Sequence, residues 1–192
     1  MEIILASASP RREQLLREMG LRFRVITPTS IEELTTGFTP AVLAMENAKR
    51  KAAAVAGRHP AALVIGADTV VVLAGKLYGK PRDLAEARRM LCELAGQHHE
   101  VITGVCLIHR PFDLELIFHD TTGVWMHPLT AAQITEYLAR IQPLDKAGAY
   151  AIQDHGDTII ERIEGSYHNV MGLPVERLRA SLEKLGLVTA RD

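Results

Sequence analysis

Hydrophobic and polar positions along this chain switch repeatedly between a strand-like and a helix-like period. Apolar runs and strict alternation indicate strands, whereas apolar residues spaced three or four apart indicate amphipathic helices. These patterns predict strands at residues 3–6, 21–26, 62–73, 100–109, 114–118, 121–126 and 158–163. They predict helices at residues 10–19, 40–57, 83–96, 130–141 and 174–185. Strands and helices interleave, but strands also follow one another in the middle of the chain. We therefore expect a mixed, twisted α/β sheet with flanking helices.

Capping residues mark where two of these helices begin. Asp83 with Glu86, and Thr130 with Gln133, have the spacing of capping boxes, in which two side chains satisfy the free backbone N–H groups of a helix start. These pairs support the helix boundaries that the periodicity predicts.

The composition is that of a globular protein with room for one domain. The chain has 192 residues, of which 47% are hydrophobic and 23% are charged, so it can bury a core without covalent staples. We expect residues 1–192 to form a single domain with two lobes around a cleft. Cys92 and Cys106 fall in apolar periodic stretches, and we expect buried thiols, which suit a reducing compartment.

Net charge and hydropathy exclude several classes of partner. The formal net charge is −1, whereas binders of nucleic acid or acidic membranes usually carry a strong basic excess. No apolar stretch approaches the roughly 20 residues of a membrane span, and the run at residues 3–6 is too short for a signal-peptide core. We therefore expect a cytoplasmic protein that binds neither nucleic acid nor membranes.

The first candidate site lies where the first strand turns into the first helix. The segment runs from Ser7 through Ser9 and Pro10 to Arg11 and Arg12, with Ser9 as the expected cap. A helix start attracts anions, and two arginines there are misplaced with respect to the helix dipole. The arrangement makes sense if an external anion binds the hydroxyls, amides and guanidinium groups together. A plain cap with two solvated arginines explains the motif about equally well.

The second candidate is Asp68, which with Thr69 interrupts a long apolar run at residues 62–73. A carboxylate in such surroundings faces a desolvation penalty of several kcal/mol unless a metal ion, a lysine or backbone amides compensate it. Alternatively, the strand ends at Gly66 and the aspartate caps a turn. Because the valines resume immediately, we favour a functional carboxylate within the sheet.

Other candidates gain meaning only in combination with these two. Lys51 lies on the Ala-rich helix and Lys80 follows a turn; either alone would be interpreted as solvated surface, but together they could neutralise a phosphate chain. Gln153 lies in a Gly-punctuated segment of the kind that forms binding loops, and its amide could read the edge of a base. The sequence lacks the Walker phosphate loop, the dinucleotide-binding fingerprint and His-Glu-x-x-His.

Taken together, these segments resemble the Maf family of septum-formation-related nucleotide pyrophosphatases. The resemblance runs from Ile4 to the last helix, with several motifs in the family's order. The matching motifs are Ser7-x-Ser9-Pro10-Arg11-Arg12, Ile65-Gly66-Ala67-Asp68-Thr69, Gly79-Lys80-Pro81, Thr103-Gly104-Val105, the segment from Asp145 to Gln153 and the segment from Gly165 to Pro174.

The resemblance implies hydrolysis of a nucleoside triphosphate between its α and β phosphates, and a fold related to inosine-triphosphate pyrophosphatases. In the family, the position matching Asp68 is taken as the proton acceptor. Arg11, Thr69 and Gln153 match the branch that acts on dTTP and UTP. The resemblance therefore predicts that these three residues select the base.

Two positions depart from the family pattern, and one acidic pair agrees with it. The family often has an acidic residue where this chain has Gln142, and Gly where it has Ala151, which affects loop geometry and not the class of protein. Glu33, from the pair at residues 32–33, matches the family's acidic pair and is our second candidate for a metal-binding carboxylate.

The residues and the resemblance together support one hypothesis and leave two alternatives open. We expect a divalent cation, Mg²⁺ or else Mn²⁺ or Co²⁺, at Asp68 and Glu33, because Mg²⁺ prefers few carboxylates plus phosphate oxygens and water. Ser7, Arg12 and the two lysines would bind the phosphate chain. The alternatives are a house-cleaning pyrophosphatase for modified triphosphates, including purines, and a non-catalytic nucleotide-binding protein linked to cell division. A homodimer is left open.

Overall fold

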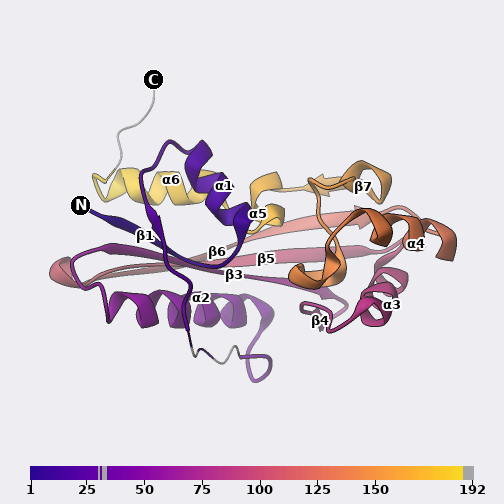
Figure 1. The fold of residues 1–192 in the computed structure, drawn as a ribbon, viewed down its shortest axis with the longest axis horizontal. Coiled ribbons are helices and arrows are strands. Elements are labelled where there is room, and N and C mark those ends of the chain that lie inside the picture. The colour runs from indigo at the N-terminus through magenta and orange to yellow at the C-terminus, as the bar shows by residue number, and fades with distance from the viewer. Residues whose placement is uncertain (30, 32–33, 188–192) are drawn as a thin grey trace. The chain divides into compact units, whose positions relative to one another are not determined.

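The structure is a computed structural model that describes residues 1–29, 31 and 34–187 (Figure 1). Its strands are β1 (Ile3–Ala6), β2 (Arg24–Val25), β3 (Leu63–Leu73), β4 (Lys76–Tyr78), β5 (His98–His109), β6 (Leu114–Met126) and β7 (Ile160–Glu164). Its helices are α1 (Pro10–Glu18), α2 (Pro40–Ala56), α3 (Leu84–Leu94), α4 (Ala131–Arg140), α5 (Tyr167–Met171) and α6 (Val175–Lys184). The five predicted helices are confirmed, each with ends within two residues of the prediction.

The strands form one mixed sheet, as the sequence predicts. Their order is β2-β1-β3-β5-β6-β7, and β4 pairs with β3 outside this path. β1 runs parallel to both β2 and β3. The pairs β3–β4 and β6–β7 are antiparallel.

The chain divides into two compact units that are each discontinuous in sequence. The first unit comprises residues 1–68, 103–120 and 172–192, and the second comprises residues 69–102 and 121–171. Strands β3, β5 and β6 contribute residues to both units. That residues 1–192 act as a single domain stays a prediction.

In the first unit, α2 lies on one side of the strands, and α1 and α6 lie on the other (Figure 1). The alanines of α2 allow a close approach to the sheet, and two strand glycines complete the fit. A Cβ atom at Gly66 would lie 2.8 Å from the backbone nitrogen of Ala52, and one at Gly104 would lie 2.5 Å from that of Met45. Both glycines are therefore required by packing, which positions the α2 side chains against β3.

The second unit has its own core between α3, α4 and the adjoining strands. Leu91, Leu94, Val124 and Tyr137 are buried together there, and Tyr150 from the loop after α4 joins them. Helix α4 begins with the predicted capping box of Thr130 and Gln133. At α3 the prediction holds in part: the Asp83 side chain accepts from the backbone N–H of Glu86, whose own carboxylate accepts from Arg82.

Several sequence predictions are wrong in detail. The strand predicted at residues 21–26 is reduced to Arg24–Val25. The two strands predicted at 114–118 and 121–126 are one strand, β6, because its half-exposed polar residues face solvent and do not interrupt pairing. Cys92 is exposed on α3, whereas Cys106 is buried as predicted.

The start of β5 also differs from the prediction. The helix stop at Gly96 suggests a turn at residues 98–99, but both histidines belong to β5, and His99 is only 1% exposed.

Among the described residues, none of the helices combines the length and the apolar character that crossing a membrane requires.

Candidate active site

Asp68 lies within β3 and is 7% exposed. It is the last residue of the first segment of the first unit. The strand continues through Gly66 and Asp68 without a turn, so the alternative of a turn-capping aspartate is wrong. One carboxylate oxygen accepts from Lys51 Nζ at 2.6 Å, and the other accepts from Asn47 Nδ2 at 3.3 Å. The compensation that the apolar sequence demanded is therefore supplied by a lysine and an amide.

Both partners of Asp68 come from α2, where Asn47 and Lys51 are four residues apart and hence lie on the same face of the helix. Asn47 is buried, and its amide also binds the backbone of Leu34 through an N–H···O bond in each direction, at 2.8 and 3.0 Å. This side chain thus connects the segment before α2 to Asp68. It was not among the sequence candidates; the available signal was an amide among the alanines of a buried helix face.

The segment between β1 and α1 is organised around Ser7 and Arg12. Ser7 is 4% exposed, and its hydroxyl accepts from the backbone N–H of Ser9 at 3.1 Å and from Arg12 at 3.3 Å. Arg12 Nε donates to the carbonyl of Gly172 at 2.8 Å. Ser9 occupies the N-cap position of α1 as predicted, but its side chain makes no capping bond. Arg12 is half-buried and fixed, not a solvated surface arginine.

The remaining candidates are less embedded. Arg11 is half-buried on α1. In the second unit, Thr69 is half-buried directly after Asp68, Lys80 is exposed after β4, and Gln153 is exposed in a turn. Glu33 lies outside the described residues. The structure therefore brings two pairs of candidates into contact, Ser7 with Arg12 and Lys51 with Asp68.

A buried cation that the sequence analysis missed lies in the loop after α4. Lys146 is 5% exposed, and its ammonium group donates to the carbonyl of Gln142 at 2.7 Å and to Asp145 at 2.8 Å. It also lies 4.0 Å from the carboxylate of Asp154. An Asp-Lys pair in a Gly-punctuated segment was the only local signal, and solvated surface is the ordinary interpretation of such a pair.

The donor set around Asp68 is compatible with a magnesium ion that arrives with a phosphate chain. The described residues contain no group of three or more His, Cys, Asp or Glu side chains that could hold a metal, so an all-protein metal cage is not formed by them. Mg²⁺ instead binds one or two carboxylates and takes its other ligands from phosphate and water. A carboxylate has about four lone-pair sites, and the bonds from Lys51 and Asn47 use two of them.

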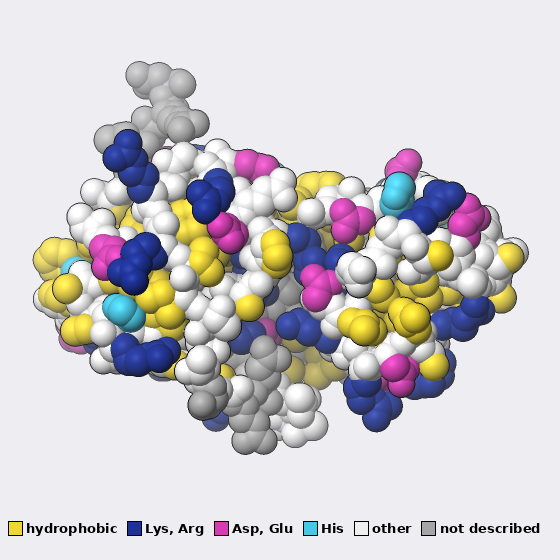
Figure 2. Space-filling view, viewed as in Figure 1, with side chains coloured by type: hydrophobic (Ala, Val, Ile, Leu, Met, Phe, Trp, Pro, Cys, Tyr) yellow, Lys and Arg dark blue, Asp and Glu magenta, His cyan; other side chains and the backbone are white. Residues whose placement is uncertain are grey.

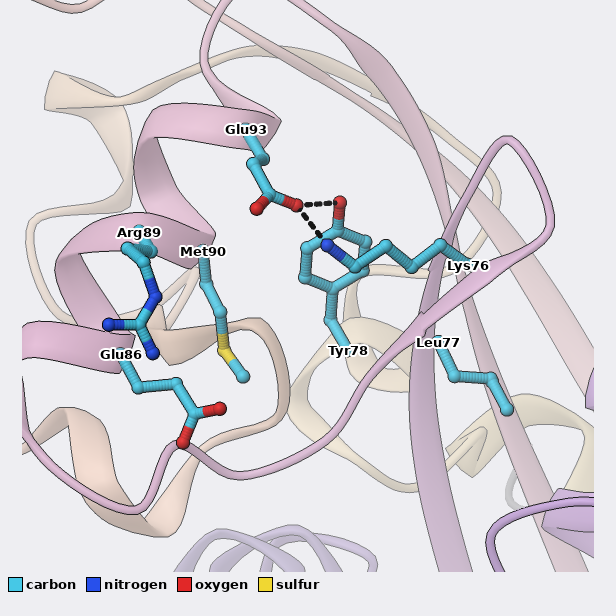
Figure 3. A pocket seen from close by; sticks show the side chains of 7 residues that line it. All are labelled: Lys76, Leu77, Tyr78, Glu86, Arg89, Met90 and Glu93. Carbon is cyan, nitrogen blue, oxygen red and sulfur yellow. Dashed lines mark hydrogen bonds and ion pairs between the residues drawn. The ribbon is translucent and has the colours of Figure 1, made fainter.

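A pocket of about 150 Å³ lies elsewhere in the second unit, between β4 and α3 (Figure 3). In it, Glu93 accepts from the hydroxyl of Tyr78 at 2.6 Å and pairs with Lys76. The described residues that line this pocket include none of the candidates named above.

On the face in Figure 2, Lys and Arg side chains have Asp and Glu side chains among them, in keeping with a net charge of −1.

Comparison with solved structures defines the class of fold. The Ham1 protein of Staphylococcus aureus superposes with a TM-score of 0.55 at 18% identity, covering 96% of this chain and 100% of that one. A HAM1 protein from Coxiella burnetii gives a TM-score of 0.50 at 17% identity, over 96% and 99% of the two chains. The chain therefore has the mixed α/β fold of these proteins, as expected.

Residues 2–185 match the family described as Maf-like protein, and the chain belongs to that family. Proteins named dTTP/UTP pyrophosphatase are close in sequence over nearly their whole length. The relative from Symbiobacterium thermophilum is 46% identical, over 96% of this chain and 94% of its own. Those from Carboxydothermus hydrogenoformans and Pelotomaculum thermopropionicum are 46% and 47% identical, over 97% and 96% of this chain and 100% and 97% of their own.

Proposed function

We propose that this chain hydrolyses dTTP and UTP to the nucleoside monophosphate and pyrophosphate. Its membership of the Maf-like family and its identity to proteins named dTTP/UTP pyrophosphatase support this activity. The observation that carries the proposal is the Asp68 carboxylate, 7% exposed and bonded to Lys51 and Asn47. A carboxylate buried in apolar surroundings costs stability, and such groups concentrate at functional sites.

Each candidate residue then has a chemical task. Asp68 orients the water that attacks the α-phosphorus, or accepts its proton. Arg12 and Lys51, together with Lys80, balance the negative charge of the phosphate chain. The Ser7 hydroxyl already accepts from Arg12 at 3.3 Å, which holds the guanidinium group in place before any substrate arrives.

In this proposal, the base of the nucleotide is selected by Arg11, Thr69 and Gln153. The amide of Gln153 can donate and accept at once, so it can pair with the edge of a pyrimidine. Its exposure in a turn leaves the amide accessible to a ligand.

A divalent cation, Mg²⁺ with Mn²⁺ or Co²⁺ as substitutes, would be held by Asp68, with Glu33 as the proposed second carboxylate. When bound, it would neutralise charge on the phosphate oxygens and so stabilise the transition state. Cytoplasmic location stays a prediction from the sequence, and whether the chain forms a homodimer stays open.

The test is a panel of nucleoside triphosphates, canonical and modified, assayed for pyrophosphate release with and without Mg²⁺. We expect the highest kcat/KM for dTTP and UTP, and loss of activity when EDTA removes the cation. Asp68→Asn should lower kcat by about 10²–10⁴-fold, the usual contribution of a general base, while calorimetry still detects dTTP binding.

Other outcomes would point to other functions. A higher kcat/KM for modified nucleotides would indicate a house-cleaning enzyme. Binding of triphosphates without pyrophosphate release would indicate a nucleotide-binding protein, and an active Asp68→Asn variant would remove Asp68 from its assigned role.

A further inference from the structure

The loop after α4, residues 142–154, contains an unfavourable backbone conformation at a buried position. Ala149 is fully buried and has φ +62°, directly after Gly148 with φ +70°. Left-handed backbone suits glycine, but the Cβ atom of alanine makes it unfavourable. Such a conformation persists only where the surrounding structure imposes it. This loop, which we call the 142–154 loop, carries Gln153.

Two buried tyrosine hydroxyls hold the loop immediately after this strained residue. Tyr137 from α4 accepts from the backbone N–H of Ala151 at 3.0 Å and donates to the carbonyl of the same residue at 3.2 Å. The hydroxyl of Tyr150 shares a hydrogen bond of 2.7 Å with Nε2 of His99 on β5. The backbone N–H and carbonyl groups of Ala151 are thus bonded to α4, and the side chain of Tyr150 is bonded to β5. Both anchoring residues, Tyr137 and His99, belong to the second unit.

Two further contacts fix the rest of the loop. The backbone N–H of Gly148 donates to the carbonyl of Gly79 at 3.1 Å, which joins the loop to the residue before Lys80. A Cβ atom at Gly148 would lie 3.2 Å from a methyl carbon of Val71, so that side chain would have to shift slightly to accommodate it. Lys146 lies 4.0 Å from Asp154. Gln153 is therefore exposed between Ala151, which Tyr137 holds, and Asp154, which faces a buried ammonium group.

We infer that Tyr137 and Tyr150 are positioning residues that set the base selectivity of this protein by fixing the 142–154 loop around Gln153. Neither is assigned a contact with substrate; each acts through the backbone that presents the amide. This inference rests on the proposed function, because it requires Gln153 to read the base. A fixed amide discriminates between bases, whereas one on a mobile turn adapts to several.

The experiment compares Tyr137→Phe and Tyr150→Phe with the matched variant Tyr78→Phe. Tyr78 is also buried in the core of the second unit, but its hydroxyl donates to Glu93 in the pocket of Figure 3. In each variant, one hydroxyl is lost and the ring is kept. The measurements are kcat and KM for dTTP, UTP and dATP, thermal unfolding, and hydrogen–deuterium exchange of the loop.

We expect Tyr137→Phe and Tyr150→Phe to raise KM for dTTP and UTP about five- to tenfold, with kcat changed less than about twofold. The ratio of kcat/KM for dTTP to that for dATP should fall by a similar factor. Exchange should accelerate in residues 145–154 of these two variants only. Tyr78→Phe should keep the wild-type KM and selectivity even where it lowers the unfolding temperature equally.

Results of three kinds would separate the hypotheses. Wild-type KM and selectivity in both loop variants would overturn the inference and leave the proposed function intact. Equal losses of selectivity in Tyr78→Phe would mean that general destabilisation, not loop position, is responsible, and would also overturn it. A wild-type protein that releases no pyrophosphate would defeat the proposed function, and unchanged exchange in the loop variants would then independently defeat the positioning role.

Discussion

Asp68 is surrounded by the apolar residues of β3, yet each of its carboxylate oxygens has a defined partner on α2. Removing a carboxylate and an ammonium group from water costs several kcal/mol, which their mutual attraction offsets only when the geometry is good. The 2.6 Å contact between Lys51 and Asp68 meets that condition, with the two side chains 12% and 10% exposed. Breaking the pair should therefore be costly.

Lys51→Met should lower the free energy of unfolding by about 3 kcal/mol, because it leaves Asp68 buried without its cation. The double variant Lys51→Met/Asp68→Asn should recover much of this loss, since no unpaired charge remains. Urea denaturation followed by circular dichroism measures both. Lys49→Met is the control on the same helix: Lys49 pairs with Glu115 where both are 39% exposed, so its loss should matter far less. Equal effects of the two single variants would contradict the prediction.

At this scale, local sequence patterns identified the unusual residues but not their partners. The apolar run around Asp68 signals a carboxylate that needs compensation, and the basic first turn of α1 signals Arg12. Asp68 on β3 pairs with Lys51 and Asn47 on α2. Because this pairing joins two separate elements, no pattern within one segment of the sequence predicts it. Lys146 was missed because its burial depends on how the loop folds back.

Helix α2 and strand β3 approach so closely that Gly66 has no space for a side chain. Its Cβ would lie 2.8 Å from the backbone nitrogen and 2.9 Å from the Cβ of Ala52. This close contact holds the helix that carries Asn47 and Lys51 at a fixed distance from Asp68.

Gly66→Ala should therefore lower the free energy of unfolding by about 1–3 kcal/mol, the usual cost of overpacking. It should also reduce kcat, since the helix that holds Asp68 must shift. Gly57→Ala, at the end of the same helix, would place its Cβ 3.5 Å from the carbonyl of Ala53, an ordinary contact, and should stay within about 0.5 kcal/mol of wild type. Denaturation and pyrophosphate release measure the two effects; an unperturbed Gly66→Ala variant would show that α2 moves freely.

Elements were predictable where periodicity was strong and less so where polar residues occur in the sheet. The amphipathic helices and their ends follow from spacing and caps. Strand β6 was divided in two because its polar middle resembles a turn, whereas pairing with neighbouring strands decides its length. The start of β5 differs from the prediction because two histidines shortly after the helix stop at Gly96 resemble a turn, although tertiary packing buries His99.

The whole molecule carries almost no net charge, so its stability near neutral pH depends more on buried groups than on overall repulsion. His99 is such a group. It is 1% exposed, its Nε2 is bonded to Tyr150, and its Nδ1 has no hydrogen-bond partner among the described residues. Burial, with a smaller effect of the neighbouring His98, lowers the pKa of His99 from 6.5 to about 4.

This shift makes the folded protein sensitive to acid. Between pH 6.5 and 4 the unfolded chain binds a proton at His99 that the folded chain does not, so the free energy of unfolding is maintained above pH 6.5 and falls as the pH drops towards 4. A difference between 6.5 and about 4 corresponds to a loss of about 3 kcal/mol. His99→Gln should remove this component, and urea denaturation at several pH values should show a shallower slope than in wild type. His98→Gln should change the slope much less, because His98 is exposed whereas His99 is buried. Identical slopes in His99→Gln and wild type would mean that His99 gains its proton equally readily in the folded chain.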